Sequence, residues 1–80
     1  MLIYDSFPSR ESAEHFAMDV AAHFALGGHI YDDVAAANAA DPYPYHLVPP
    51  IVHIERTGNA ADEDAIAQLA RQHGGLFVGT

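Results

Sequence analysis

The stretch "SRESAEHFAMDVAAHFALGG", residues 9–28, has the pattern of an amphipathic helix with both of its ends marked. Ser9 suits the N-cap, because its hydroxyl can accept a hydrogen bond from a main-chain N–H of the first turn. Glu11 and Glu14 follow in the early turns, where the helix dipole favours acids. Apolar residues at spacings of three and four form one stripe: Ala13, Phe16, Ala17, Val20, Ala21 and Phe24. Gly27 and Gly28 predict the stop, so the stretch predicts a helix that packs this stripe on a sheet.

A second helix is predicted near the carboxyl end of the chain. A turn at Thr57 and Gly58 precedes Asn59, a candidate N-cap. Acidic residues 62–64 load the first turn of the helix. Its apolar stripe is Ile66, Leu69 and Ala70, and Gly74 and Gly75 end it.

Short runs rich in β-branched and aromatic residues predict four strands, at residues 1–5, 29–34, 51–56 and 76–80. In the third run, the period of two places Val52 and Ile54 on one face of the sheet. Ile51, His53 and Glu55 then lie on the other face.

The predicted order is β-α-β-β-α-β, the split arrangement of the ferredoxin-like fold. We therefore expect an α+β protein with a four-stranded antiparallel sheet and two helices on one face. Right-handed crossovers would place the first and third strands in the centre. Residues 1–80 form one domain, and the sheet face away from the helices is expected to be open.

The stretch "DPYPYHLVPP", residues 41–50, connects the second and third predicted strands. Prolines have no N–H to donate, so this stretch cannot be a central strand. Residues that precede proline are held extended, which predicts a stiff loop. Tyr43 and Tyr45 have two possible uses: they fold back to cover the small core, or they stand out as a contact for a partner.

The charge balance limits the possible partners. The chain has eleven acidic residues, three arginines and no lysine, for a net charge of −8. Nucleic-acid binding requires clustered cations, so neither nucleic acid nor an anionic membrane is expected as a partner. A protein with a basic surface is the natural complement, although the charge could also serve solubility alone.

Size and composition suggest self-association and a cytoplasmic location. A chain of 80 residues rich in alanine buries little area, and small cores are often supplemented by dimerisation. We expect a homodimer formed through a sheet edge or the open sheet face. The first residues lack the basic and apolar regions of a signal peptide, and no run approaches a membrane span, so a cytoplasmic protein is expected.

Several polar residues form candidate sites. His15, Asp19 and His23 are spaced by four, so one helix face could offer nitrogen and oxygen ligands to zinc, or they are simply exposed side chains. Tyr31, His53, Glu55 and Phe77 are expected on the open sheet face. The histidine and glutamate could perform acid–base work there, or form a polar pair on a wet face. The sequence has no cysteine and none of the common catalytic motifs, so neither an enzyme nor a cofactor is predicted.

Two segments resemble a known family. Residues 13–17, Ala-Glu-His-Phe-Ala, and the carboxyl-terminal glycines and aromatic residue at Gly74, Gly75, Phe77 and Gly79 are similar to elements of the B-type regulators of ribonuclease E activity. That family consists of small acidic ferredoxin-like proteins. The resemblance implies a protein that binds and modulates another protein.

Two functions are therefore considered. The first is a small acidic interaction module, such as a regulator or inhibitor of another protein. It would contact a basic protein surface through Glu11, Glu14, Asp19, Tyr43 and Tyr45. The alternative is a small-molecule or metal-binding domain that uses the open sheet face.

Overall fold

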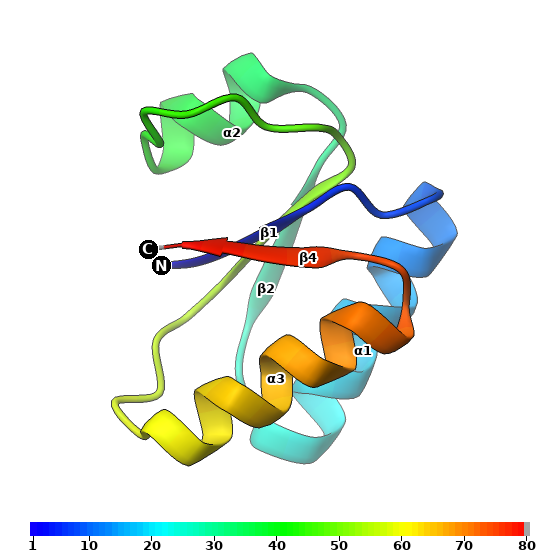
Figure 1. Cartoon of the computed structure of the whole chain (residues 1–80), viewed down its shortest axis with the longest axis vertical. Helices are drawn as coiled ribbons and strands as arrows, with labels where there is room; N and C mark the ends of the chain where they lie inside the picture. Colours follow the sequence, from blue (N-terminus) through cyan, green and yellow to red (C-terminus); the bar gives the residue numbers. More distant parts are fainter. Residues whose placement is uncertain (80) are drawn as a thin grey trace.

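The computed structural model describes residues 1–79, which form a four-stranded antiparallel sheet and three helices (Figure 1). The elements are β1 (Leu2–Asp5), α1 (Arg10–Phe24), β2 (Gly28–Tyr31), α2 (Val34–Ala40), β3 (Ile51–Ile54), α3 (Ala60–Gln72) and β4 (Leu76–Gly79). The strand order is β2-β3-β1-β4, and each neighbouring pair is antiparallel. The predicted α+β class and the central first and third strands are confirmed.

The predicted number of helices is wrong, because α2 lies between β2 and β3 where a loop was expected. Asp33 begins this helix: its Oδ1 atom accepts a 2.7 Å hydrogen bond from the N–H of Ala36. The alanine-rich residues that follow have high helix propensity, so a capped helix forms without an apolar stripe in the sequence. The element order therefore differs from the predicted β-α-β-β-α-β layout.

Helices lie on both faces of the sheet, so the predicted single helical layer is wrong. Figure 1 shows α1 and α3 on one face and α2 on the other. We call these the α1/α3 face and the α2 face. Ile3 and Ile51 point toward the α2 face, where Ala37 of α2 and Leu47 of the following loop bury them. Alternating side chains made both faces of the central strands apolar, and this second apolar surface had to be covered.

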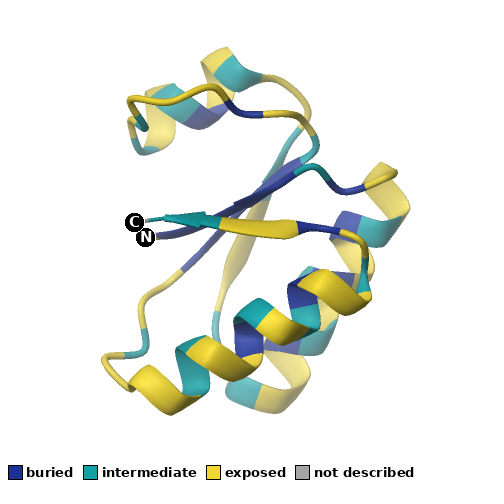
Figure 2. Ribbon diagram, viewed as in Figure 1, coloured by how far each residue is buried: buried dark blue, intermediate teal, exposed yellow. Residues whose placement is uncertain are grey.

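The larger core lies under the α1/α3 face. Leu2, Tyr4, Val52 and Ile54 of the sheet meet buried side chains of both helices there: Ala13, Phe16 and Val20 of α1, and Ile66 and Ala70 of α3. The rings of Tyr4 and Phe16 pack edge to face, with centroids 5.0 Å apart. In Figure 2 the buried colour follows β1, β3 and the inner sides of these helices. The predicted faces of Val52, Ile54, Ile51 and His53 are confirmed.

The predicted N-caps are present, but the first helix ends earlier than predicted. Ser9 and Asn59 accept hydrogen bonds from Ser12 and Asp62, respectively. Helix α1 closes at Ala25, whose φ of 56° is left-handed. Gly28 instead begins β2, so this strand covers residues 28–31 and not the predicted 29–34. The predicted last strand is present as β4, and Thr80 lies outside the described residues.

Candidate protein-binding surface

A groove of about 300 Å³ lies between α1 and the edge strand β2. Its walls are mostly apolar or made of small residues: Glu14, Ala17, Met18, Ala21, Leu26, Gly27, Gly28 and Ile30. Met18 is 66% exposed, so the groove has a large apolar side chain open to solvent on its α1 wall. The groove therefore presents apolar surface to solvent along one side of the sheet.

The sheet edge beside this groove is a free one. β2 ends the strand order, so only one of its sides pairs with a neighbour, β3. Unpaired N–H and C=O groups of an edge strand are able to pair with another chain. At the opposite edge, the carbonyl of Val78 in β4 already accepts a 2.6 Å hydrogen bond from the Tyr43 hydroxyl. No side-chain hydrogen bond within residues 1–79 reaches the main chain of β2.

The predicted acidic contacts of α1 divide into two groups. Glu11 and Glu14 are exposed on the helix, and Glu14 lines the groove. Asp19 is half-buried, and its Oδ2 atom lies 2.8 Å from Nε2 of His73. This contact joins α1 to the end of α3, so the Asp19 carboxylate is engaged within the fold.

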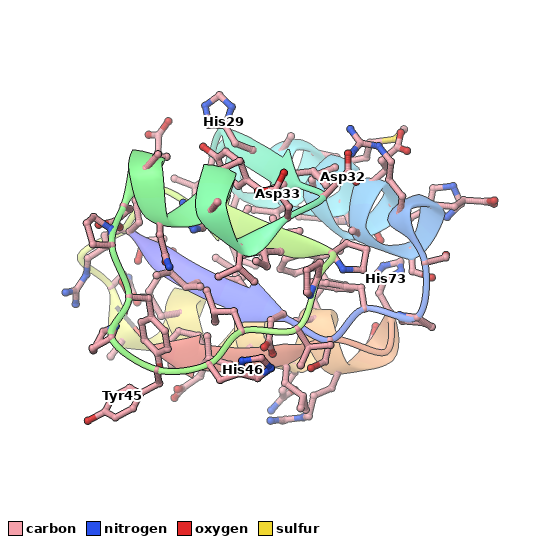
Figure 3. All side chains as sticks on the ribbon, turned by 90° about the horizontal axis from the view of Figure 1, so that it is seen from above. His29, Asp32, Asp33, Tyr45, His46 and His73 are labelled. Atoms are coloured by element: carbon pink, nitrogen blue, oxygen red, sulfur yellow. The ribbon has the colours of Figure 1, made fainter. Side chains whose placement is uncertain are left out.

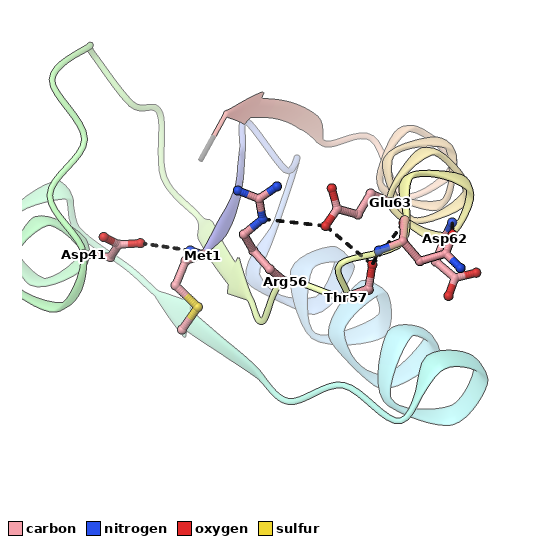
Figure 4. A network of polar contacts seen from close by, with 7 residues as sticks. Met1, Asp41, Arg56, Thr57, Asp62 and Glu63 are labelled. Carbon is pink, nitrogen blue, oxygen red and sulfur yellow. Dashed lines mark hydrogen bonds and ion pairs between the residues drawn. The ribbon is translucent and has the colours of Figure 1, made fainter.

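Most of the cationic groups of the chain form ion pairs with its own carboxylates. Arg10 forms ion pairs with Glu14, at 3.5 Å, and with Asp32. Arg56 lies 3.8 Å from Glu63, which also contacts Thr57 (Figure 4). At the other side of the same figure, the Met1 amino group lies 3.6 Å from Asp41. Exposed pairs of this kind add little stability, but they leave the surface dominated by carboxylates.

The two tyrosines of the proline-rich loop have different environments. Tyr43 is half-buried against the α2-face core and bonds to Val78, so it covers the core. Tyr45 is 72% exposed and points away from the molecule (Figure 3). Its ring packs edge to face on that of Tyr43, with centroids 5.6 Å apart. Tyr43 therefore covers the core, whereas Tyr45 stands out from it.

The residues predicted for an open sheet face do not form one surface. His53 is 1% exposed on the α2 face, where its ring packs 4.8 Å from that of Tyr31. Phe77 lies on the α1/α3 face, with its ring centroid 5.3 Å from that of Tyr4. Glu55 follows β3, and its carboxylate lies against Gly27. The prediction of an open face was wrong because α2 and residues 41–50 cover it.

His53 is a buried base without a hydrogen-bond partner. Neither of its ring nitrogens has a partner among the described residues. Burial lowers the pKa of His53, and the nearby Asp41 partly opposes this effect. The positive amino terminus and His29 lower the pKa further. His53 is almost fully buried and is not among the residues that line the groove between α1 and β2.

The metal-site hypothesis receives no geometric support within residues 1–79. No group of three or more potential ligands from histidine, aspartate and glutamate is assembled there. His15 and His23 are exposed on α1, while the intervening Asp19 contacts His73.

Packing and backbone conformation account for four of the nine residues that carried the family resemblance. Ala13 and Phe16 are buried in the main core. Gly74 has a φ of +85°, and a side chain at Gly75 would overlap the ring of Phe7. These positions are set by the fold, so they do not themselves identify a binding surface.

Comparisons with known proteins do not identify relatives of this chain: no family model, curated protein or solved structure matches it. In the described residues, no helix is long and apolar enough to cross a membrane.

Sequence reasoning identified Glu14 but missed the groove. Ala17 and Ala21 were assigned to the core stripe, whereas Ala21 is exposed and both line the groove. A signal was present in Met18: a large apolar residue beside that stripe widens the apolar face of α1 beyond what the sheet covers.

Proposed function

We propose that this protein is a small acidic interaction module that binds a protein with a basic surface. The observation that carries the proposal is the apolar groove beside the free β2 edge, with Glu14 on its wall. Apolar area supplies binding free energy, while the surrounding carboxylates accelerate encounter with a basic partner.

The overall charge supports the same proposal. The chain carries a net charge of −8, and Arg10 and Arg56 are engaged in ion pairs. The resemblance to B-type regulators of ribonuclease E activity favours an enzyme as the partner and this chain as its regulator or inhibitor. The fold would then be a ferredoxin-like fold in which α2 is inserted between β2 and β3.

The direct test is to capture a partner from host lysate, identify it by cross-linking, purify it and measure the association rate. The partner should be basic at the contact, and its association should slow as salt rises, because 0.1 M salt screens charges over about 10 Å. Glu14→Gln should slow association more than Asp64→Asn, which removes one charge from an exposed position on α3. A rate that is independent of salt, or equal effects of both variants, would contradict the proposal.

A further inference from the structure

We propose that the β2 edge binds an extended segment of the partner as a fifth strand, with an apolar side chain in the groove and lysine or arginine on either side. The preference for cations rests on the proposed function. The pairing itself rests on the geometry of β2, which is independent of the partner's identity.

The hydrogen-bonding pattern shows which main-chain groups are available. The N–H of Glu55 donates to the carbonyl of Gly27 at 3.4 Å, so this opposed pair is hydrogen-bonded. Hydrogen-bonded and non-bonded pairs alternate along an antiparallel ladder. The His29–His53 and Tyr31–Ile51 pairs are therefore bonded, while Gly28 and Ile30 direct their N–H and C=O groups outward. An incoming strand would pair with these two residues.

The Ile30 side chain and the Cα atom of Gly28 both line the groove. Gly28 and Ile30 are opposed to Ile54 and Val52, whose side chains lie on the α1/α3 face. An added strand would lie about 4.8 Å beyond β2 and would place alternate side chains on the same face. The residue paired with Gly28 or Ile30 would therefore direct its side chain toward Met18 of α1.

Gly28 has no room for a side chain on the face that lines the groove. A Cβ atom at this position would lie 2.7 Å from Cδ1 of Ile54, so a larger residue would disturb the core. Glycine at this position therefore lets the Ile54 side chain pack beneath β2, and the groove above it stays open.

Acidic residues lie near both ends of this edge. Glu14 is the one charged residue among those that line the groove, and it shares the cation of Arg10 with Asp32, so a net negative charge remains there. At the start of β2, Oε1 of Glu55 lies only 2.8 Å from where a Cβ of Gly27 would be, so this carboxylate extends over the glycine. These positions favour a partner segment with cations on both sides of its apolar residue.

The same charges disfavour a second copy of this chain as the occupant. Antiparallel pairing of two β2 strands would bring Glu55, at the start of one strand, near Asp32 and Asp33, which follow the other. Each copy also carries a net charge of −8.

The test is an NMR titration of the isotopically labelled protein with a short capped peptide. The probe has a Thr-Val-Thr centre with two lysines on each side. We expect saturable shifts of the Gly28 and Ile30 amides, and at least about tenfold weaker binding when glutamates replace the lysines.

Peptides with a methylated backbone nitrogen test the direction of the hydrogen bonds. In the added strand the valine N–H points to β2, while the N–H groups of the two neighbouring residues point away from it. N-methylation of the valine should therefore weaken binding about tenfold or more, while N-methylation of the preceding threonine should change it less than about twofold.

Matched variants of the protein test the groove. Met18→Glu should abolish the shifts, whereas Ala22→Glu, an exposed α1 position outside the groove lining, should preserve them. Ile30→Pro removes an outward N–H and should abolish binding, whereas Ile30→Val should retain it. Each variant's folded spectrum is confirmed first, and Met18→Glu with Ala22→Glu decides the question if Ile30→Pro does not fold.

Three results would overturn the inference: no saturable shift with the lysine peptide, equal effects of the two N-methylated peptides, or shifts at β2 that depend only on protein concentration. The last would identify a second copy as the occupant. Failure of the proposed function is distinguishable, because peptide binding at β2 without any basic protein partner would contradict only that proposal. Conversely, a basic partner whose binding is unchanged by Met18→Glu would contradict only the strand-addition inference.

Discussion

The hydroxyl of Tyr43 donates a 2.6 Å hydrogen bond to the main-chain oxygen of Val78, which ties the proline-rich loop to the edge strand β4. The residues are 35 positions apart in the chain. The contact closes the loop over the α2 face and occupies a carbonyl of one sheet edge, while the β2 edge stays free.

Tyr43→Phe is expected to lower the free energy of unfolding by about 1 kcal/mol, because the carbonyl of Val78 loses its partner in a half-buried site. Urea unfolding measures this change. Tyr45→Phe is the matched control, since the Tyr45 side chain is exposed; equal losses in both variants would show that the hydrogen bond does not fasten the loop.

Tyr4→Phe, unlike Tyr43→Phe, should not lower the free energy of unfolding. The Tyr4 hydroxyl is buried without a partner in the described structure, and burial together with the nearby Glu63 raises its pKa. Removing an unpaired buried hydroxyl leaves the ring packing in place, so the variant should be as stable as the wild type or more stable by up to about 1 kcal/mol. A loss of stability in urea would mean that the hydroxyl does have a partner in solution.

Asp5→Ala should destabilise the fold by about 1–3 kcal/mol. The Asp5 side chain is nearly buried, and its Oδ2 accepts a 2.8 Å hydrogen bond from the N–H of Val48. Asp5→Asn keeps an acceptor oxygen and should lose less. Thermal or urea unfolding of both variants is the measurement, and a cost for Asp5→Ala no larger than that for the exposed Asp64→Asn would contradict this assignment.

The buried His53 predicts that stability falls in mild acid. Burial lowers the pKa of His53 below the ordinary 6.5, so the unfolded chain binds a proton at a higher pH than the folded chain does. The contribution of the neutral ring is therefore complete above about pH 6.5 and decreases as the pH falls toward the folded-state value. The midpoint of urea unfolding is measured at several pH values from about 7.5 down to about 5. It should fall less for His53→Leu than for the wild type. Parallel curves for the two proteins would remove His53 as the cause.

The sequence was sufficient for the elements that satisfy local rules. Ser9 and Asn59 predicted the two long helices, because a cap followed by a regular apolar stripe is a local signal. The sequence was insufficient for α2, where Asp33 caps a run of alanines that has no such stripe. The prediction of an open sheet face failed for the same reason. Ala37 is a small residue, and it helps to bury Ile3 and Ile51 only because α2 is placed over them. The groove was also missed: Met18 gave a signal, but whether its side chain is covered depends on how α1 packs beside β2.

Amide hydrogen exchange along β2, with and without the lysine-flanked peptide, tests the central claim most directly. In the free protein, the amides of His29 and Tyr31 should exchange slowly, because they pair with β3, while those of Gly28 and Ile30 should exchange fast. Saturating peptide should slow Gly28 and Ile30 selectively. Unchanged exchange at these two amides, in a sample whose resonance shifts show that the peptide is bound, would contradict strand addition at β2.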